Sequence, residues 1–395
     1  MIRTIKAFDI RGRNVLLRVD YNVPMENGVV RNNFRIRSSL STIQSCLEGG
    51  ASIVIMSHMG RPKNKDDIKY SLVSVGEELA RLLEMPIKFS EDCISQDAID
   101  TSLGLKAGEI HLLENLRFHK GEVNNDKEFS RQLSRHGHIY INDAFGTAHR
   151  SHASNVGVAE YFKHSGIGWL MDKEINFLQN QMNKPNRPLT LILGGAKINS
   201  KIKLIENFLN KADNIIIGGG MSFTFMKAMG KNIGGSLFEK SMVPIALDLI
   251  NKARMKGVKL IFPCDLICSK SIDDRSSNEL YTIDDLPKDL MGLDIGPKTI
   301  ELFHSIILPS ETILWNGPMG VFEIEQYAKG TRKLGQILAD RASSNTKVIV
   351  GGGDTATALE LFDLSKFMTH VSTGGGASLQ LLSGESLIAI QSLEI

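Results

Sequence analysis

Runs of glycine in the second half of this chain have the composition and position of phosphate-binding turns. Each run follows a short apolar stretch, and the runs are Gly194–Gly195, Gly218–Gly220, Gly351–Gly353 and Gly374–Gly376. Glycine accepts positive φ and lets a ligand approach the backbone closely. A strand, a glycine turn and the start of a helix together direct N–H groups and a helix dipole at one point, which suits a phosphate. Four such turns predict a nucleotide or polyphosphate at the strand ends of a parallel sheet.

Charged side chains follow two of these turns. Lys197 and Lys201 are spaced i, i+4 after Gly194–Gly195, so we expect them to share one face of a helix. Two cations there suit a polyphosphate, although an ordinary solvated lysine pair is the alternative. Asp354 follows the Gly351–Gly353 turn and is free to bind Mg²⁺ while the N–H groups of the turn bind phosphate. A helix N-cap role for Asp354 is the alternative, and both roles can hold together.

The first part of the chain is rich in arginine and histidine instead. Residues 1–165 contain 13 of the 18 arginines and 8 of the 10 histidines, whereas 24 of the 36 glycines come later. Loops after expected strands deliver Arg, His or Asn to one rim of a sheet: Asp20–Pro24, Ser57–Pro62, Glu114–His119 and Asp143–His152. Such a cluster would bind a small, strongly anionic molecule. Solvated surface arginines and chance variation are the alternatives, and the repeated placement weighs against them.

These residues must be positioned by an alternating series of strands and helices. The expected strands are Val15–Val19, Ser52–Met56, Ile110–Leu113, Ile139–Asn142, Leu189–Leu193, Asn214–Ile217, Lys259–Phe262, Thr312–Leu314, Lys347–Val350 and His370–Ser372. The expected helices are Ile36–Leu47, Leu72–Leu83, Asp126–Ser134, Ser200–Lys211, Met242–Met255 and Glu325–Arg341. Strands that alternate with helices predict right-handed βαβ units and parallel sheets, hence an α/β fold.

The length of 395 residues favours two domains. A net charge of +2 gives no whole-chain argument for nucleic acid or membrane binding, and we expect neither partner. The N-terminal residues resemble no secretory signal, so a cytoplasmic protein is expected. The four cysteines, Cys46, Cys93, Cys264 and Cys268, fit reduced, buried thiols, and core packing is favoured over a metal site for Cys264 and Cys268.

Standard motifs of other phosphate-binding and hydrolytic enzymes are missing from the sequence. It contains no G-x-x-x-x-G-K-[ST] loop, no G-x-G-x-x-G after a strand and no G-x-S-x-G elbow. These absences disfavour a standard P-loop NTPase, a dinucleotide dehydrogenase and an α/β-hydrolase.

The order and spacing of nine segments resemble the phosphoglycerate kinase family across essentially the whole chain. The resemblance is carried by Arg18–Pro24, Ser57–Pro62, Leu113–Phe118, Asn142–Arg150, Leu193–Lys197, Ile217–Met221, Trp315–Glu323, Gly351–Thr355 and Gly374–Ser378. It implies two Rossmann-like, doubly wound parallel-sheet domains joined by a helical hinge. Residues 1–170, completed by the tail 381–395, would bind phosphoglycerate, 171–188 would form the hinge, and 189–380 would bind nucleotide.

The resemblance also implies roles for individual residues. Residues that match the phosphoglycerate site are Asp20, Asn22, Arg35, His58, Arg61, Arg117 and Arg150. Residues that match the nucleotide site are Lys197 and Lys201 at the phosphates, Gly292, Asn316 and Glu323 around the adenosine, and Gly352, Gly353, Asp354 and Thr355 at the phosphate and metal end. Residues expected to act on the transferred phosphoryl group are Arg35, Lys197, Lys201 and the backbone N–H groups of Gly374 and Gly375.

The implied reaction is reversible, Mg²⁺-dependent phosphoryl transfer from 1,3-bisphosphoglycerate to ADP, a carboxyl-group phosphotransferase activity of glycolysis and gluconeogenesis. We expect direct in-line transfer after hinge closure, because this chemistry needs positioning and charge stabilisation more than covalent help. The family resemblance suggests a monomer. Two rivals are a non-catalytic sensor on the same scaffold, which would lack a group such as Lys197 or Arg35, and a sugar or acetate kinase, which would need a base aimed at a hydroxyl.

Overall fold

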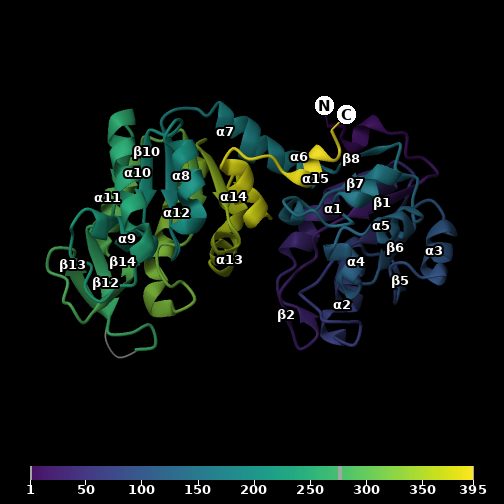
Figure 1. The fold of residues 1–395 in the computed structure, drawn as a ribbon, viewed down its shortest axis with the longest axis horizontal. Helices are drawn as coiled ribbons and strands as arrows, with labels where there is room; N and C mark the ends of the chain where they lie inside the picture. The colour runs from purple at the N-terminus through teal and green to yellow at the C-terminus, as the bar shows by residue number, and fades with distance from the viewer. Residues whose placement is uncertain (1, 275–277, 395) are drawn as a thin grey trace. The chain divides into compact units, whose positions relative to one another are not determined.

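The computed structural model describes residues 2–274 and 278–394, which fall into two compact units (Figure 1). Unit 1 comprises residues 1–176 and 386–395, and unit 2 comprises residues 177–385. Within the described ranges, no helix is long and apolar enough to cross a membrane.

Unit 1 is built on a six-stranded sheet in which all paired strands are parallel. The order across the sheet is β5 (Lys88–Ser90), β6 (Ile110–Leu113), β4 (Ser52–Met56), β1 (Asn14–Arg18), β7 (Ile139–Asn142) and β8 (Ser165–Ile167). A two-stranded hairpin, β2 (Met25–Glu26) and β3 (Val29–Val30), precedes the first helix. The helices are α1 (Phe34–Glu48), α2 (Val73–Leu83), α3 (Gln96–Leu103), α4 (Lys120–Val123), α5 (Lys127–Ser134), α6 (Trp169–Ile175) and α15 (Ile388–Gln391).

Alternate side chains of this sheet pack on opposite faces. Leu17 and Ile55 join a core cluster with Ile36 of α1 and Val75 of α2. Leu16, which points to the other face, is also fully buried. Both faces are therefore covered, as in a doubly wound fold.

Unit 2 contains a second parallel six-stranded sheet. Its order is β11 (Lys259–Ile261), β10 (Asn214–Ile217), β9 (Leu189–Leu193), β15 (Thr312–Asn316), β16 (Lys347–Gly351) and β17 (His370–Val371). Its helices are α7 (Gln181–Asn183), α8 (Ile202–Phe208), α9 (Met221–Ala228), α10 (Val243–Lys256), α11 (Pro297–Ile307), α12 (Lys329–Ser343), α13 (Gly353–Leu361) and α14 (Gly376–Leu382). The chain order of the strands reverses between β9 and β15, and ligands of such sheets bind beyond the strand ends at that reversal.

The sequence analysis did not predict the three-stranded antiparallel sheet of unit 2. Its order is β13 (Glu279–Thr282), β12 (Asp265–Ser269) and β14 (Met291–Ile295), with a register irregularity between Ile267 and Cys268. The strands carry charged residues and a glycine, which are uncommon in strands. A loop joins β11 directly to β12, so the sequence lacks the strand–helix alternation of a βαβ unit there.

The predicted α/β class with two parallel sheets is confirmed. The expected strands and helices are present, most of them within two residues of their predicted ends. Four short strands of unit 1, β2, β3, β5 and β8, were not predicted. The expectation of buried cysteines is right for Cys46, Cys93 and Cys268 but wrong for Cys264, which is exposed in the loop that precedes β12.

The stretch predicted as a hinge helix is helical but irregular. It contains α6, a π-helical turn over Asn176–Asn180, and α7. The division between the two units falls between Asn176 and Phe177, inside the π-helical turn.

Candidate active site

The loops that follow the central strands of unit 1 are bonded to one another. Ser57 Oγ donates to the carbonyl oxygen of Val19 (2.9 Å) and accepts from the Tyr21 N–H (2.9 Å). Gly60 donates its N–H to Asn22 Oδ1 at 2.8 Å, and Arg117 Nη1 donates to the Gly60 carbonyl at 2.5 Å. These bonds hold Asn22 and Arg117, both predicted binding residues, to one rim of the sheet.

Asp20, Arg35 and His58 form a second group at this rim. Arg35 Nη1 donates to Asp20 Oδ2 at 2.9 Å, and His58 Nδ1 lies 3.7 Å from Asp20 Oδ1. Burial lowers the pKa of His58 well below its usual value, and the surrounding arginines lower it further. The His58–Asp20 contact is therefore between a neutral imidazole and a carboxylate, so His58 adds hydrogen-bonding capacity without charge.

Two partly buried arginines repel each other at the same rim. Burial and then the charges of Arg150 and Arg18 lower the pKa of Arg117 to about 10. Burial also lowers the pKa of Arg150; Asp20 opposes the shift, and Arg61, Arg18 and Arg35 add to it. Arginines that outnumber the carboxylates beside them, Asp20 and Glu122, are stabilised by an added anion. Arg61, the remaining predicted arginine, is exposed.

Arg18, the last residue of β1, supports this rim through buried hydrogen bonds. The sequence analysis missed this role. Its side chain is fully buried, with Nε donating to Ser154 Oγ at 2.8 Å and Nη2 lying 3.3 Å from His58 Nδ1. The fully buried Glu122 accepts from the N–H (2.9 Å) and Oγ (2.7 Å) of Ser154. The available signal was an arginine inside an otherwise apolar strand, since a buried cation needs a partner.

In unit 2, Lys201 lies at the reversal point between β9 and β15. Its Nζ donates to the carbonyl oxygens of Gly194 (2.5 Å) and Asn316 (2.8 Å), and the residue is 7% exposed. Burial lowers the pKa of Lys201 to about 7, and the charge of Asp354 opposes that shift. Lys201 is thus a buried amine whose positive charge is poorly compensated, beside the loops that follow β9 and β15.

The prediction that Lys197 and Lys201 share one helical face is wrong. The helix begins only with a 3-10 turn at Asn199–Lys201 and continues as α8, so the exposed Lys197 precedes it. The reason is that Glu239 Oε2 accepts from the N–H of Ile198 (2.6 Å) and Asn199 (3.4 Å), which caps the chain there. The other three glycine turns lead directly into α9, α13 and α14, as expected.

The glycines of these turns are of two kinds. At Gly194, Gly219 and Gly317, an added Cβ would lie 2.1 to 2.5 Å from backbone atoms of a neighbouring loop. These glycines allow the loops after β9, β10 and β15 to pack backbone against backbone. At Gly353 an added Cβ would meet nothing within 4 Å, and at Gly375 its nearest neighbour would be Gly353 N at 4.0 Å. The N-termini of α13 and α14 therefore border open space.

The predicted phosphate and metal residues surround this open space. Asp354 is exposed in the first turn of α13. Thr355 Oγ1 accepts from the Gly317 N–H at 2.7 Å, so Thr355 fixes the loop after β15. Asn316 Nδ2 is buried without a hydrogen-bond partner, and an added Cβ at Gly352 would lie 3.0 Å from it. The Asn316 amide, which the sequence analysis places near the adenosine, thus faces the Gly351–Gly353 turn.

The Gly374 N–H already has a partner in this structure. It donates to Ser372 Oγ at 3.1 Å, and Gly375 is the N-cap residue of α14. This bond must break or be shared before the Gly374 N–H can meet a phosphoryl group.

Of the residues expected around the adenosine, Asn316 ends β15, Gly292 lies on the antiparallel sheet, and Glu323 lies on the loop after β15. Gly292 is in β14, and its N–H donates to Ser236 Oγ at 3.0 Å. An added Cβ at Gly292 would lie 2.6 Å from Phe223 Cζ of α9, so a side chain there would displace the apolar cluster that contains Phe223. Glu323 is exposed.

The two parallel sheets, one rim of arginines and one set of glycine turns define a phosphotransferase of the kinase class. The chain matches the family described as phosphoglycerate kinase over residues 5–385. Phosphoglycerate kinases of Chloroherpeton thalassium and Thermosipho africanus are each 44% identical over 391 residues, covering 99% of this chain and 98% and 97% of theirs. The chain belongs to the phosphoglycerate kinase family, whose members are kinases that act on a carboxyl group.

Solved structures agree with this assignment. A phosphoglycerate kinase from Coxiella burnetii matches with a TM-score of 0.86 and 37% identity, covering 100% of this chain and 99% of that one. A phosphoglycerate kinase from Pyrococcus horikoshii matches with a TM-score of 0.86 and 31% identity, covering 100% and 98%.

Proposed function

We propose that unit 1 binds 3-phosphoglycerate or 1,3-bisphosphoglycerate, that unit 2 binds ADP or ATP with Mg²⁺, and that a phosphoryl group passes directly between them. The observation that carries the proposal is that the two sites offer different groups to a ligand. Unit 1 offers arginines that repel one another, whereas unit 2 offers open glycine amides beside a lysine and a carboxylate. A small polyanion suits the first site, and a nucleotide phosphate chain with its cation suits the second.

The phosphoglycerate site would use the charge excess at the rim of unit 1. Arg117 and Arg150 would bind phosphate or carboxylate oxygens, since the pKa values of both are lowered by burial and by neighbouring arginines. The neutral His58 would donate or accept one hydrogen bond. Asp20 holds Arg35 at 2.9 Å and would orient it toward the transferred group. Asn22 and Arg61 complete the proposed set.

The nucleotide site would lie beyond β9, β15 and β16. Gly352, Gly353 and Thr355 would approach the phosphates, and Gly292, Asn316 and Glu323 would contact the rest of the nucleotide. Asp354 fits Mg²⁺, because its carboxylate is exposed beside open space and Mg²⁺ prefers one or two carboxylates together with substrate phosphates. When bound there, Mg²⁺ would neutralise charge on the phosphate oxygens.

The chain's own groups would stabilise the moving phosphoryl group without a covalent intermediate. Arg35 would act from unit 1, and Lys197, Lys201 and the N–H groups of Gly374 and Gly375 from unit 2. In the direction of ATP synthesis the attacking oxygen belongs to ADP, so no general base is needed. Preorganised cations and N–H groups supply this kind of stabilisation.

Transfer between two units requires that they close around the substrates, which also excludes water. The proposed hinge is the segment 171–188, and its support is local. The division between the compact units lies inside the π-helical turn Asn176–Asn180. Single π-helical turns are rare and occur frequently at functional sites. Through its family, we further propose that the chain acts as a cytoplasmic monomer in glycolysis and gluconeogenesis.

A coupled assay with 3-phosphoglycerate, ATP and Mg²⁺ tests the reaction. Arg35→Ala and Lys197→Ala should each lower kcat at least tenfold, or about 1.4 kcal/mol of transition-state stabilisation. Matched controls are Arg131→Ala on α5 and Lys203→Ala on α8, whose side chains pair with Glu128 and Glu385 at the surface. Controls should keep wild-type kcat. Absence of turnover by folded wild-type protein would instead support the non-catalytic sensor.

A further inference from the structure

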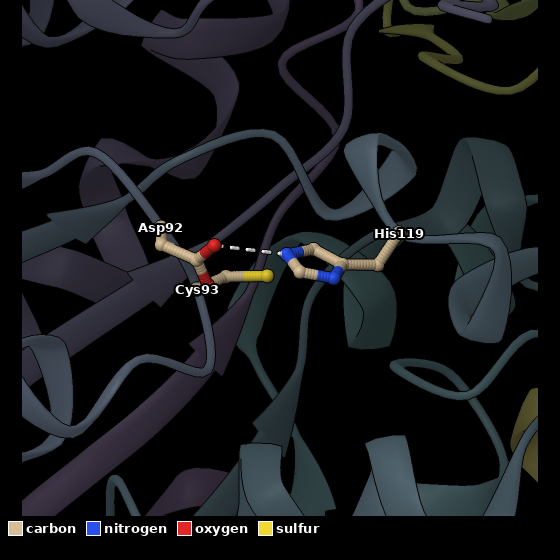
Figure 2. A group of neighbouring side chains, drawn as sticks. All are labelled: Asp92, Cys93 and His119. Carbon is tan, nitrogen blue, oxygen red and sulfur yellow. Dashed lines mark ion pairs between the residues drawn. The ribbon is translucent and has the colours of Figure 1, made fainter. Parts of the chain in front are cut away.

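Asp92, Cys93 and His119 meet in unit 1, outside the site described above (Figure 2). Asp92 and Cys93 follow β5, and His119 comes two residues after Arg117 in the loop that follows β6. Figure 2 shows the three side chains directed toward one another. A carboxylate oxygen, the sulfur and an imidazole nitrogen all lie within 4.8 Å of one another.

The distance between the candidate ligand atoms of Asp92 and His119 suits one metal ion. Asp92 Oδ2 lies 3.2 Å from His119 Nε2. Two atoms bound tetrahedrally to one Zn²⁺ at about 2.0–2.1 Å are roughly 3.3 Å apart. The sulfur needs only a small movement to complete a three-ligand set.

The imidazole nitrogen is buried beside the carboxylate. His119 Nε2 has Asp92 Oδ2 as its close polar neighbour, at 3.2 Å. A metal ion between the two atoms would replace this contact with two metal–ligand bonds.

Neighbouring groups fix the three ligands in place. The Ile94 N–H donates to Asp92 Oδ1 at 2.8 Å, and the other oxygen, Oδ2, is the one that pairs with Lys65 and His119. His136 Nε2 lies 3.0 Å from the Cys93 carbonyl, and the His119 ring packs against Phe129 with centroids 5.4 Å apart. Contacts of this kind orient metal ligands and raise affinity.

We propose that Asp92, Cys93 and His119 bind a borderline-soft divalent cation of the Zn²⁺ class, with water as the fourth ligand. A thiolate and an imidazole select such ions over Mg²⁺, which prefers oxygen. The site is distinct from the proposed Mg²⁺ ligand Asp354, which belongs to unit 2. Lys65 pairs with Asp92 and must release it, but its side chain is 54% exposed, so it returns to water at little cost.

Binding must release one proton. The thiolate is the form of cysteine that binds metal, and a free cysteine is a thiol at neutral pH. The metal–sulfur bond forms as the Cys93 proton leaves to solvent.

The test is a Co²⁺ titration of the whole protein without nucleotide, followed by absorption spectroscopy. We expect one Co²⁺ per chain, with thiolate-to-cobalt charge transfer. Cys93→Ser should remove the charge-transfer band and weaken affinity on the order of 100-fold or more, since loss of an outer contact alone costs 10- to 100-fold. His119→Gln should weaken affinity while keeping the band, and Lys65→Met should strengthen affinity.

The control is Cys264→Ser, which removes the exposed cysteine in unit 2 and should leave the titration unchanged. A band that survives Cys93→Ser, or disappears with Cys264→Ser, would overturn the proposal, as would failure of the wild-type protein to bind Co²⁺. If Cys93→Ser does not fold, opposite affinity changes in His119→Gln and Lys65→Met still support the site, and equal affinities contradict it.

Discussion

The side chain of Lys201 is buried, and burial opposes its positive charge. Its ammonium donates to two backbone carbonyl groups, yet burial lowers its pKa to about 7. The phosphates of a bound nucleotide would add negative charge beside it and raise that pKa. Binding and protonation should therefore be coupled at this residue.

We expect MgATP binding at pH 8 to take up protons, because Lys201 is mostly neutral in the free protein and charged in the complex. Titration calorimetry in buffers of different ionisation enthalpy measures this uptake. Lys201→Met should abolish most of it. Equal proton uptake by the wild type and the variant would show that another group titrates.

A buried histidine pair in unit 1 should make its stability sensitive to acid. Ser102 Oγ contacts both His111 Nδ1 (2.9 Å) and His136 Nδ1 (2.7 Å), and burial lowers the pKa of each histidine to about 4. The unfolded chain, with histidine pKa near 6.5, binds protons first as pH falls. The stability that these neutral histidines contribute is therefore present above pH 6.5 and is lost as pH falls toward 4.

His136→Gln removes one of these titrations. The loss of unfolding free energy between pH 6.5 and 4.5 should become shallower by up to about 1.4 kcal/mol per pH unit. Urea unfolding of unit 1, followed by Trp169 fluorescence at several pH values in a Trp315→Phe background, gives the slope. A variant with the wild-type slope would mean that His136 is not kept neutral in the folded state.

At the residue scale, the sequence predicted where side chains lie when their position depends on neighbouring residues in the chain. Asn22 and Arg117 lie on bonded loops, as expected from their positions after strands. Arg18 and its support, Ser154 and Glu122, could not be predicted in this way. Their contacts join residues 136 and 32 positions apart, and no local pattern encodes such pairing.

At the scale of elements, the glycine turns combine two physical requirements. Gly219 has φ of +61° and packs against the Gly195 backbone, whereas Gly353 borders open space at the start of α13. The first glycine serves packing, and the second leaves room for a ligand. The sequence alone gives both the same appearance.

This difference predicts opposite effects of the same substitution. Gly219→Ala should destabilise unit 2 by on the order of 3 kcal/mol, from positive φ and a backbone clash. Gly353→Ala should leave stability unchanged or slightly raised, since alanine favours helix, but should weaken MgATP binding about tenfold or more. Denaturant unfolding and calorimetry separate the two outcomes. Equal losses of stability in both variants would contradict the distinction.

The parallel strands could be predicted because they are short apolar runs that alternate with amphipathic helices. β12, β13 and β14 could not, since their residues carry charge, and their pairing includes an irregular register. The start of α8 was also missed, because its position depends on Glu239, about 40 residues away. Long-range capping leaves no signal in the local sequence.

At the scale of the whole molecule, the end of the chain completes the first unit. Residues 386–395 group with unit 1, where the Ala389 N–H donates to the Ala148 carbonyl at 3.0 Å. Leu387 and Leu393 are buried. The chain therefore leaves unit 1 and returns to it, so the two units cannot be separated by a single cut.

Truncation after Glu385 should destabilise unit 1 by on the order of 3–5 kcal/mol, because the buried apolar side chains of the tail are lost. The only two tryptophans, Trp169 and Trp315, report on unit 1 and unit 2 respectively. Thermal unfolding of the variants Trp315→Phe and Trp169→Phe, with and without the tail, separates the transitions. A shift confined to the Trp315 signal would show that the tail stabilises unit 2 and not unit 1.

The central claim is that phosphoglycerate and nucleotide bind to separate units, and calorimetry of two exposed-residue variants tests it most directly. Arg61→Met should weaken 3-phosphoglycerate binding at least tenfold and leave MgADP binding unchanged. Asp354→Asn should do the reverse. The account is contradicted if either variant weakens both ligands equally, or if Arg61→Met weakens only MgADP.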